Sequence, residues 1–310
     1  MPGTLRRWSL AALGSTTLLV IGAAAVPHAE QRAPAAPAPE VVRATLDRAT
    51  ARVQDFFERA QSLVCTERVH VQPLSYGLSG DGFGRTVESE LRVSWDPQDD
   101  GGAAEAKAMR QVMKVNGHRP RKIDRNNCTT PERHDTEPQV LSMLLPGERD
   151  DYTWSMAGPA TIDGRPALLL DFREKQALSL EVTVENDDED CLTYTLKGGL
   201  RGRLWLDAES HDVLRLDQRL SGQANAPMPR VLQRRPGASP TMTVERFDTS
   251  YRFKRMRFEN PDETLVLPVS STSLRITQGA GTPRMRVTTE YRDYHRFLTG
   301  GRLVPGPAPQ

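Results

Sequence analysis

The side chains that could perform chemistry are scattered along this sequence of 310 residues. The six histidines form no His-x-x-x-His pair with a glutamate at helical spacing, so the zinc-binding pattern of a metalloprotease is absent. The glycine patterns of a serine-hydrolase elbow, a phosphate-binding loop and a dinucleotide-binding turn are absent as well. We therefore expect a protein that is not an enzyme and holds no cofactor.

Two clusters of acidic residues are the remaining candidates for a metal site. Glu132, His134 and Asp135 stand together in "PERHDTE", and five acids crowd the segment "ENDDEDC" at 185–191. The second segment has no glycine turn and none of the ligand spacing of a calcium-binding EF-hand loop. We interpret the first cluster as a solvated loop and the second as a charged hairpin tip that keeps a sheet edge soluble. No metal site is expected.

The segment "RFKRMRF" at 252–258 mixes basic and aromatic residues, as do proteins that bind single-stranded nucleic acid. The formal net charge of the chain is only +1, which gives no long-range attraction for nucleic acid. We expect no nucleic-acid partner. The segment is better explained as a sheet edge guarded by cations, or as a contact for anionic lipid or glycan.

The N-terminal residues have the layout of a secretory signal peptide, with two arginines, an apolar run from Leu10 to Val26 and then small residues. We expect cleavage after Ala29, with Ala25 as the alternative, so that residues 1–29 are removed and the protein is periplasmic or secreted. A retained membrane anchor is the other interpretation, although the run is short for a bilayer span of about 20 residues. No later apolar run approaches that length.

An exported chain meets an oxidising compartment, where its three cysteines are expected to form one disulfide and leave one thiol. Cys65 stands among apolar residues of an expected strand, which is the usual setting of a buried, unreactive cysteine. Cys128 and Cys191 stand in polar loops. We expect the disulfide to join Cys128 to Cys191.

The elements that position these residues can be read from hydrophobic periodicity. An Ala/Pro linker at 30–40 leads into an amphipathic helix from Val42 to about Gln61, with apolar residues at helical spacing. About ten strands follow, most of them joined by short turns and marked by alternating apolar and polar residues, as in "RTVESELRVSW" at 85–95. Only one more helix is expected, a short one over "EPQVLSMLLP" at 137–146.

Strands in series with two helices, rather than alternating with them, predict an α+β fold built on a large antiparallel sheet. No internal repeat and no break rich in proline and glycine divides the chain, so we expect a single domain at 41–297. The segment 298–310 is expected to be a disordered tail.

The stretch "GRLWLDAESHDVLRL" at 202–216 predicts a β-hairpin with an apolar face and a charged face. The leucines of its two strands lie on one side, and arginines and aspartates lie on the other. Opposite charges on neighbouring strands contribute roughly 0.2–1 kcal/mol per pair. We interpret the charged face as a contribution to solubility.

The order of residues in this hairpin resembles that of the outer-membrane lipoprotein carrier superfamily, the LolA-like fold, and of related periplasmic stress-sensor proteins. In these proteins Trp-aliphatic-Asp precedes a short polar turn and a return strand with an aliphatic-Arg pair. The segments "SLVCTERVHV", "MKVNGHRP" and "DETLVLPVSSTSLRI" follow the same general order. The chain is also similar to a group of exported bacterial proteins of unknown function with an "LVC-x-E" opening. The segments 96–108 and 225–240 have no counterpart in the superfamily.

The resemblance implies a strongly curved antiparallel sheet, a half-barrel, folded around helices, with lipids or acyl chains of lipoproteins held in its concavity. The expected function is therefore non-enzymatic binding of an apolar ligand in the concave face. The residues expected to line this cleft are Leu91, Val93, Trp95, Met113, Val115, Leu204, Trp205, Leu206, Leu214 and Leu216. The alternative function is the docking of a partner chain of the cell envelope on the outer face or on an edge strand of the sheet.

Overall fold

The computed structural model describes residues 38–60, 63–96, 105–122, 124, 140–184, 192–234, 239–259, 262–279 and 283–296. The chain divides into two units, Met1–Ala36 and Pro37–Gln310, and all described residues belong to the second unit. The predicted signal peptide and the predicted tail lie outside the described residues, as does most of the linker, and these assignments stay predictions.

The expected N-terminal helix is present as α1, which spans Pro39–Arg59. A proline at its first position has no N–H that the helix would leave unpaired, so the helix can begin there. Its buried apolar residues, among them Leu46, Val53 and Phe57, recur every three or four positions and form a stripe. This stripe is the surface that α1 offers to the sheet.

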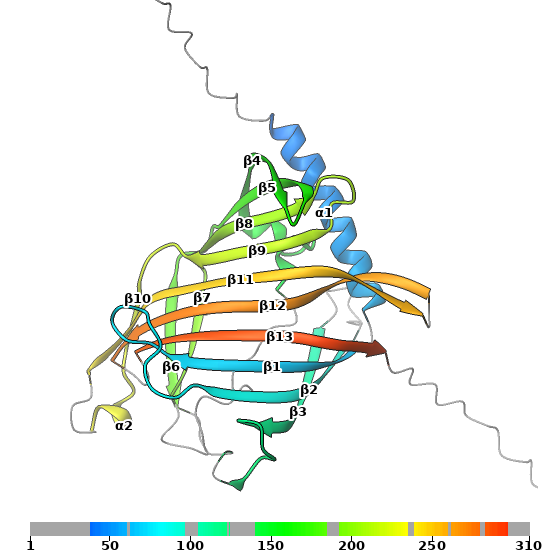
Figure 1. Ribbon diagram of the computed structural model, residues 1–310. Helices are drawn as coiled ribbons and strands as arrows, with labels where there is room; N and C mark the ends of the chain where they lie inside the picture. Colours follow the sequence, from blue (N-terminus) through cyan, green and yellow to red (C-terminus); the bar gives the residue numbers. More distant parts are fainter. Residues whose placement is uncertain are drawn as a thin grey trace, which may run out of the picture. The chain divides into compact units, whose positions relative to one another are not determined.

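The strands form one open antiparallel sheet in the order β3-β2-β1-β13-β12-β11-β9-β8-β5-β4, with β10 paired to β11, and a separate two-stranded hairpin of β6 and β7 (Figure 1). The strand bounds in the first half are β1 Leu63–Pro73, β2 Arg85–Asp96, β3 Glu105–Val115, β4 Tyr152–Ile162, β5 Arg165–Glu174, β6 Ser179–Val184 and β7 Leu192–Lys197. Those in the second half are β8 Leu200–Asp207, β9 Val213–Leu220, β10 Ala224–Pro227, β11 Thr241–Glu259, β12 Asp262–Gln278 and β13 Arg284–Arg296. The predicted fold class, a large antiparallel sheet with few helices, is confirmed.

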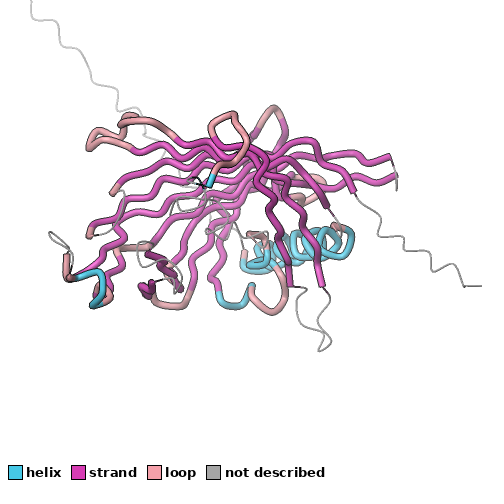
Figure 2. The backbone as a smooth tube through the Cα atoms, turned by 90° about the horizontal axis from the view of Figure 1, so that it is seen from below, coloured by secondary structure: helices cyan, strands magenta, loops and turns pink. Residues whose placement is uncertain are grey.

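The two faces of this sheet differ in what covers them. The main core joins the apolar stripe of α1 and Leu141–Leu145 to leucines and phenylalanines of β5, β8, β9, β11 and β12. A second cluster packs β6, β7 and the short helix α2, Arg230–Gln233, against residues of β9 and β11 on the same side. Figure 2 shows the sheet bending over both helices. We call the side that faces α1 the inner face and the opposite side the outer face.

The expected helix over 137–146 is not formed as predicted. The described part of this segment contains only the single 3-10 turn η3, Ser142–Leu144. Leu145 is extended, with φ −73° and ψ 152°, because the proline that follows it disfavours helical backbone at the preceding residue. A leucine-rich segment therefore packs under α1 as a turn. A second turn, η4, spans Arg149–Asp151.

The segments without a counterpart in the resemblance contain regular structure. β3 begins at Glu105, inside 96–108; α2 lies inside 225–240, and β10 begins one residue before that segment and ends within it. Among the described residues, no helix is both long enough and apolar enough to cross a membrane.

Candidate functional site

A pocket on the inner face lies between the C-terminal half of α1, the segment Val140–Leu141 and six strands of the sheet. Its volume is about 70 Å³. We call it the inner pocket; its lining residues are Phe56, Leu63, Cys65, Leu91, Val93, Ala108, Arg110, Val140, Leu141, Tyr251, Phe253, Leu267, Pro268, Tyr291 and Tyr294. Sites for small ligands usually enclose roughly 300–1,000 Å³. The pocket in this form holds only a small part of a ligand.

A charged pair joins the lining of the inner pocket to the buried interior: Arg110 lines the pocket, and its partner Glu67 is not among the lining residues. Glu67 of β1 is 0% exposed, and Arg110 of β3 reaches it across β2. The guanidinium donates from Nε to Oε2 at 2.7 Å and from Nη2 to Oε1 at 3.2 Å. Ser89, the residue of β2 opposite Glu67, is small and leaves room for this contact. Two-point hydrogen bonding is the geometry that lets a carboxylate and a guanidinium share a site removed from water.

Neutral hydroxyl and thiol groups surround this pair. Burial, and next the negative charge of Glu67, raise the pKa of Cys65 to about 12. Burial likewise raises the pKa of Tyr291 and Tyr294 well above the ordinary value for tyrosine. A thiol that stays protonated at neutral pH is a poor nucleophile. These groups are suited to hydrogen bonding at the pocket floor, as Tyr294 does when it donates to the Pro268 carbonyl at 2.8 Å.

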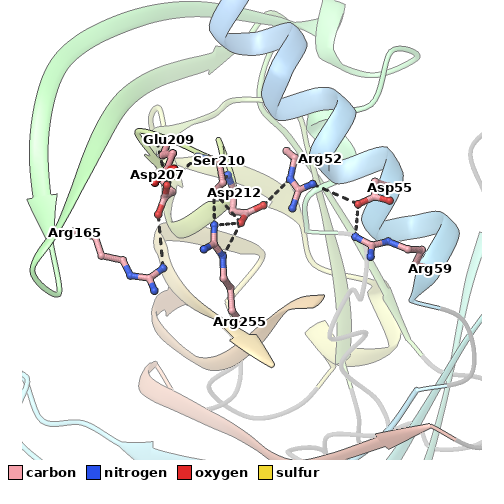
Figure 3. Close-up of polar contacts among 9 residues, drawn as sticks. All are labelled: Arg52, Asp55, Arg59, Arg165, Asp207, Glu209, Ser210, Asp212 and Arg255. Atoms are coloured by element: carbon pink, nitrogen blue, oxygen red, sulfur yellow. Dashed lines mark hydrogen bonds and ion pairs between the residues drawn. The ribbon is translucent and has the colours of Figure 1, made fainter. Parts of the chain in front are cut away.

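The helical wall of the inner pocket is anchored by Asp212, at the end of the turn between β8 and β9 (Figure 3). Its side chain is 3% exposed and accepts hydrogen bonds from both sides. Arg52 of α1 donates to Oδ1 at 2.8 Å, while Arg255 of β11 donates to Oδ2 from Nε at 2.9 Å and from Nη2 at 2.6 Å. One carboxylate thus ties the helix to two parts of the sheet.

The turn itself is built to hold Asp212 in place. Asp207 accepts hydrogen bonds from the backbone N–H groups of Glu209 and Ser210 at 3.1 and 3.0 Å. His211 takes a left-handed backbone with φ of 63°, and the Ser210 hydroxyl donates to Asp212 at 2.9 Å. Burial acts to raise the pKa of Asp212, but hydrogen bonds from Arg52, Arg255 and Ser210 outweigh it and lower the pKa.

A second hollow lies on the outer face, across β4, β5, β8, β9, β11 and β12. Its volume is about 870 Å³, and its lining is rich in charged side chains, with five arginines and three aspartates. We call it the outer groove; the charged residues that line it are Asp171, Arg173, Arg201, Arg203, Asp217, Arg219, Arg246 and Asp248. Trp205 also lines it, with the Arg215 guanidinium 4.6 Å from its ring centre.

The residues expected to line an apolar cleft lie in different environments. Leu91 and Val93 line the inner pocket. The most deeply buried of the others are Val115 at 1% exposure and Leu204, Leu206 and Leu216 at 0%. The three leucines belong to the main core under α1. Contact of any of these residues with a ligand stays a prediction.

Two of the remaining expected lining residues, Met113 and Leu214, depart from simple alternation, and a third, Trp205, follows it to the outer face. Met113 and Leu214 each occupy a β-bulge, since the pairing shifts between Glu88 and Ser89 and between Trp205 and Leu206. An extra residue at a bulge breaks the alternation of side chains. Met113 is accordingly 47% exposed, and Val213 takes the core position next to Leu216. Trp205 faces the outer groove.

Several predictions fall where the structure gives no description. The side chain of Trp95 and the pair Cys128 and Cys191 lie outside the described residues, so the expected disulfide stays a prediction. Cys65 is a free, buried thiol, as expected. The two acidic clusters at 132–135 and 185–191 are not described either. Among the residues that are described, no group of three metal-ligating side chains is assembled.

Sequence reasoning missed Glu67, Arg110 and Asp212. A signal for Glu67 was present, because it shares its side of β1 with Leu63, Cys65 and Val69. An acid on the apolar side of a strand requires a buried partner. Arg110 and Asp212 gave no comparable signal, since their partners lie on other strands or on α1.

No protein-family model matches this chain, and no curated protein is similar to it by sequence. Solved structures are similar to it at low identity. An outer membrane lipoprotein-sorting protein domain from Vibrio parahaemolyticus is 10% identical, with 84% of this chain and 94% of that chain covered and a TM-score of 0.39. A DUF1329 family protein from Desulfovibrio piger is 10% identical, with 83% and 94% covered and a TM-score of 0.40.

A LolA superfamily protein from Nitrosomonas europaea is 9% identical, with 83% of this chain and 94% of that chain covered and a TM-score of 0.34. These TM-scores lie below 0.5, so the likeness carries nothing about ligand or partner. The superfamily that the 202–216 hairpin resembles is nevertheless among those whose solved structures this chain is similar to.

Proposed function

We propose that this chain binds an apolar ligand, such as the acyl chain of a lipid or lipoprotein, in the inner pocket and performs no catalysis there. The observation that carries the proposal is the combination of an apolar wall with a buried polar floor. Phe56, Val93 and Phe253 supply aliphatic and aromatic surface. Arg110, which Glu67 holds in place, and the neutral tyrosines supply hydrogen-bonding groups. Apolar walls with a few placed polar groups are the general composition of ligand sites.

The volume of the pocket sets a condition on binding. About 70 Å³ does not hold an acyl chain, so part of the wall must move. The segment Val140–Leu141 is a good candidate, because it is a turn held by η3 rather than a strand of the sheet. Each square ångström of apolar surface that the ligand and wall remove from water contributes roughly 25 cal/mol, which offsets the cost of opening.

The direct experiment is to purify the full chain from a bacterial host and extract it with organic solvent. Native mass spectrometry before extraction, and lipid analysis after it, are expected to show bound lipid. The extracted protein is then expected to bind a fluorescent fatty acid with saturation. Protein that carries no lipid and leaves the fluorescent probe free at micromolar concentration would contradict the proposal.

Filling the pocket is expected to weaken this binding. Ala108 lines the pocket and is exposed, so a larger side chain can enter from β3 without displacing the core. We expect Ala108→Trp to weaken fatty-acid binding by about tenfold or more, since even small losses of apolar fit cost that much. Fluorescence titration of the extracted protein measures the change.

The matched control is Met109→Trp, which adds the same indole to the same strand. Met109 is 67% exposed and does not line the pocket. Both variants are expected to unfold within about 0.5 kcal/mol of the parent chain, as surface substitutions usually do. Equal loss of binding in the two variants would remove the inner pocket from consideration.

The alternative function, docking of a partner chain of the envelope, predicts the reverse pattern. β3 is an end strand of the sheet, and Met109 and Met113 are exposed on it. If this edge docks a partner, Met109→Trp impairs the complex and Ala108→Trp leaves it intact. The same two proteins therefore discriminate between the two functions.

A further inference from the structure

The outer groove contains a row of three arginines on neighbouring strands. Arg173 of β5 lies directly opposite Arg201 of β8, and Arg201 lies directly opposite Arg219 of β9. All three line the groove. Directly opposite residues of antiparallel strands have Cβ atoms about 4.5–5.5 Å apart, and like charges at such positions destabilise a sheet.

The next row of the same face is neutralised. Arg203 donates to Asp171 at 2.5 and 2.8 Å. Asp217, opposite Arg203, accepts from Arg215 at 2.8 and 2.7 Å and from the Ser250 hydroxyl at 2.6 Å. The acids nearest to the arginine row are thus already occupied by other donors.

No such partner is available to the arginine row within the described part of the chain. No ion pair or side-chain hydrogen bond joins Arg173, Arg201 or Arg219 to another described residue. Arg201 Nε is buried and has no hydrogen-bond acceptor. Asp248, the other acid of the groove, pairs with Arg246. The row therefore presents three guanidinium groups to a hollow of about 870 Å³, which lies in the range of ligand sites.

We propose that the outer groove binds a ligand with closely spaced phosphoryl groups, held by Arg173, Arg201 and Arg219. A guanidinium group can donate two parallel hydrogen bonds to two oxygens of one phosphate, which makes arginine the preferred residue for phosphate recognition. Three guanidinium groups on adjacent strands suit a diphosphate or a longer polyphosphate better than a single carboxylate. The source is either a free polyphosphate or the phosphorylated headgroup of a lipid. This site lies on the other face of the sheet from the inner pocket and does not depend on it.

Inorganic pyrophosphate is the probe for the shared chemistry. Isothermal titration of the full chain is expected to show saturable binding, and pyrophosphate is expected to raise the unfolding temperature, because it binds the folded state. Sulfate at equal ionic strength is the control for general charge screening. No saturable binding at millimolar pyrophosphate, or equal effects of sulfate, would overturn the proposal.

The variants test the row itself. We expect Arg173→Gln with Arg201→Gln to weaken pyrophosphate binding by about tenfold or more, since each removes a charged hydrogen-bond donor. The double variant is expected to unfold no earlier than the parent chain, because it removes a like-charge contact. The control is Arg257→Gln, an arginine 74% exposed and paired with Asp262 outside the groove. Parent-like binding in the double variant, or an equal loss of binding in the control, would contradict the assignment of the phosphoryl site to the arginine row.

Vesicles distinguish the two sources. Phosphatidylcholine vesicles with and without phosphatidic acid are offered to the parent chain and to the double variant. Binding that requires both phosphatidic acid and the arginine row identifies a lipid headgroup. Binding of pyrophosphate alone, with no vesicle binding, identifies a soluble phosphate ligand. Absence of pyrophosphate binding overturns the proposal whatever the vesicles show, and leaves the apolar-ligand proposal untouched.

Discussion

Replacement of Glu67 by leucine is expected to lower the free energy of unfolding by about 3–5 kcal/mol, because it strips a buried arginine of its carboxylate. Glu67 is 0% exposed, and the side chain of Arg110 is 8% exposed, so water reaches neither partner freely. Arg110→Met is expected to cost a similar amount, since it strands the carboxylate instead. Urea unfolding followed by far-UV circular dichroism measures both.

The double variant separates two quantities: the destabilisation caused by leaving one buried charge unpaired, and the net contribution of the pair to the free energy of unfolding. Glu67→Leu combined with Arg110→Met replaces both charges with apolar side chains of similar volume. Replacement of a buried pair in this way is often neutral or stabilising, so we expect the double variant to recover most of the lost stability. A double variant about as unstable as either single variant would mean that the pair has a net stabilising value for the sheet, and a loss equal to the sum of the two would mean that the two side chains contribute independently.

The recovered stability would bear on the proposed function. If the fold is stable without the pair, a charged pair whose arginine lines an apolar pocket is better explained by the ligand than by the core. The double variant is then expected to bind fatty acid with altered preference for the head group, measured against the corresponding alcohol. The same preference in both proteins would make the pair purely structural.

The sequence predicted those parts of the fold in which the hydrophobic pattern of an element agrees with the burial of its residues in the structure. The apolar stripe of α1 and the alternation of β2 are visible to a reader who knows nothing of the other elements. Met113 and Leu214 were expected to follow the alternation of their strands, but each is the extra residue at a bulge, which changes the side on which neighbouring side chains lie. Such shifts are set by pairing with a neighbouring strand, which sequence alone does not give.

The candidate sites were harder to foresee for the same reason. Arg173, Arg201 and Arg219 are separated by up to 46 residues and become one row only through the register of three strands. In the sequence each appears as one of many outward-facing charges. The turn at Asp207–Asp212 was given no role beyond that of a short polar turn, because the arginine of α1 that Asp212 binds lies far away in the chain.

Asp212→Asn is expected to lower the free energy of unfolding by about 2–3 kcal/mol at neutral pH, since hydrogen bonds to a charged group contribute about 1.5–3 kcal/mol each. The estimate stays below that for Glu67 because Arg52 and Arg255 are 42% and 38% exposed and regain water when the carboxylate is lost. Hydrogen exchange is expected to show faster opening of α1 in the variant, because Asp212 is a tie between the helix and β11. Unchanged protection of α1 would contradict the anchoring role.

The stability loss caused by Asp212→Asn is expected to depend on pH, whereas the loss caused by a packing defect would not. The pKa of Asp212 is lower in the folded chain than its ordinary value of 3.8, so its contribution is present above that value and is lost as the pH falls through the folded pKa. The stability difference between the parent chain and Asp212→Asn should therefore be largest at neutral pH and shrink towards pH 3. Asp207 and the other acids titrate in both proteins and cancel in the difference.

Asp262→Asn is the control: its pair with Arg257 is exposed on both sides, so it should change stability by at most about 0.5 kcal/mol at either pH. A difference for Asp212→Asn that is the same at both pH values would show that its shape, and not its charge, holds the helix.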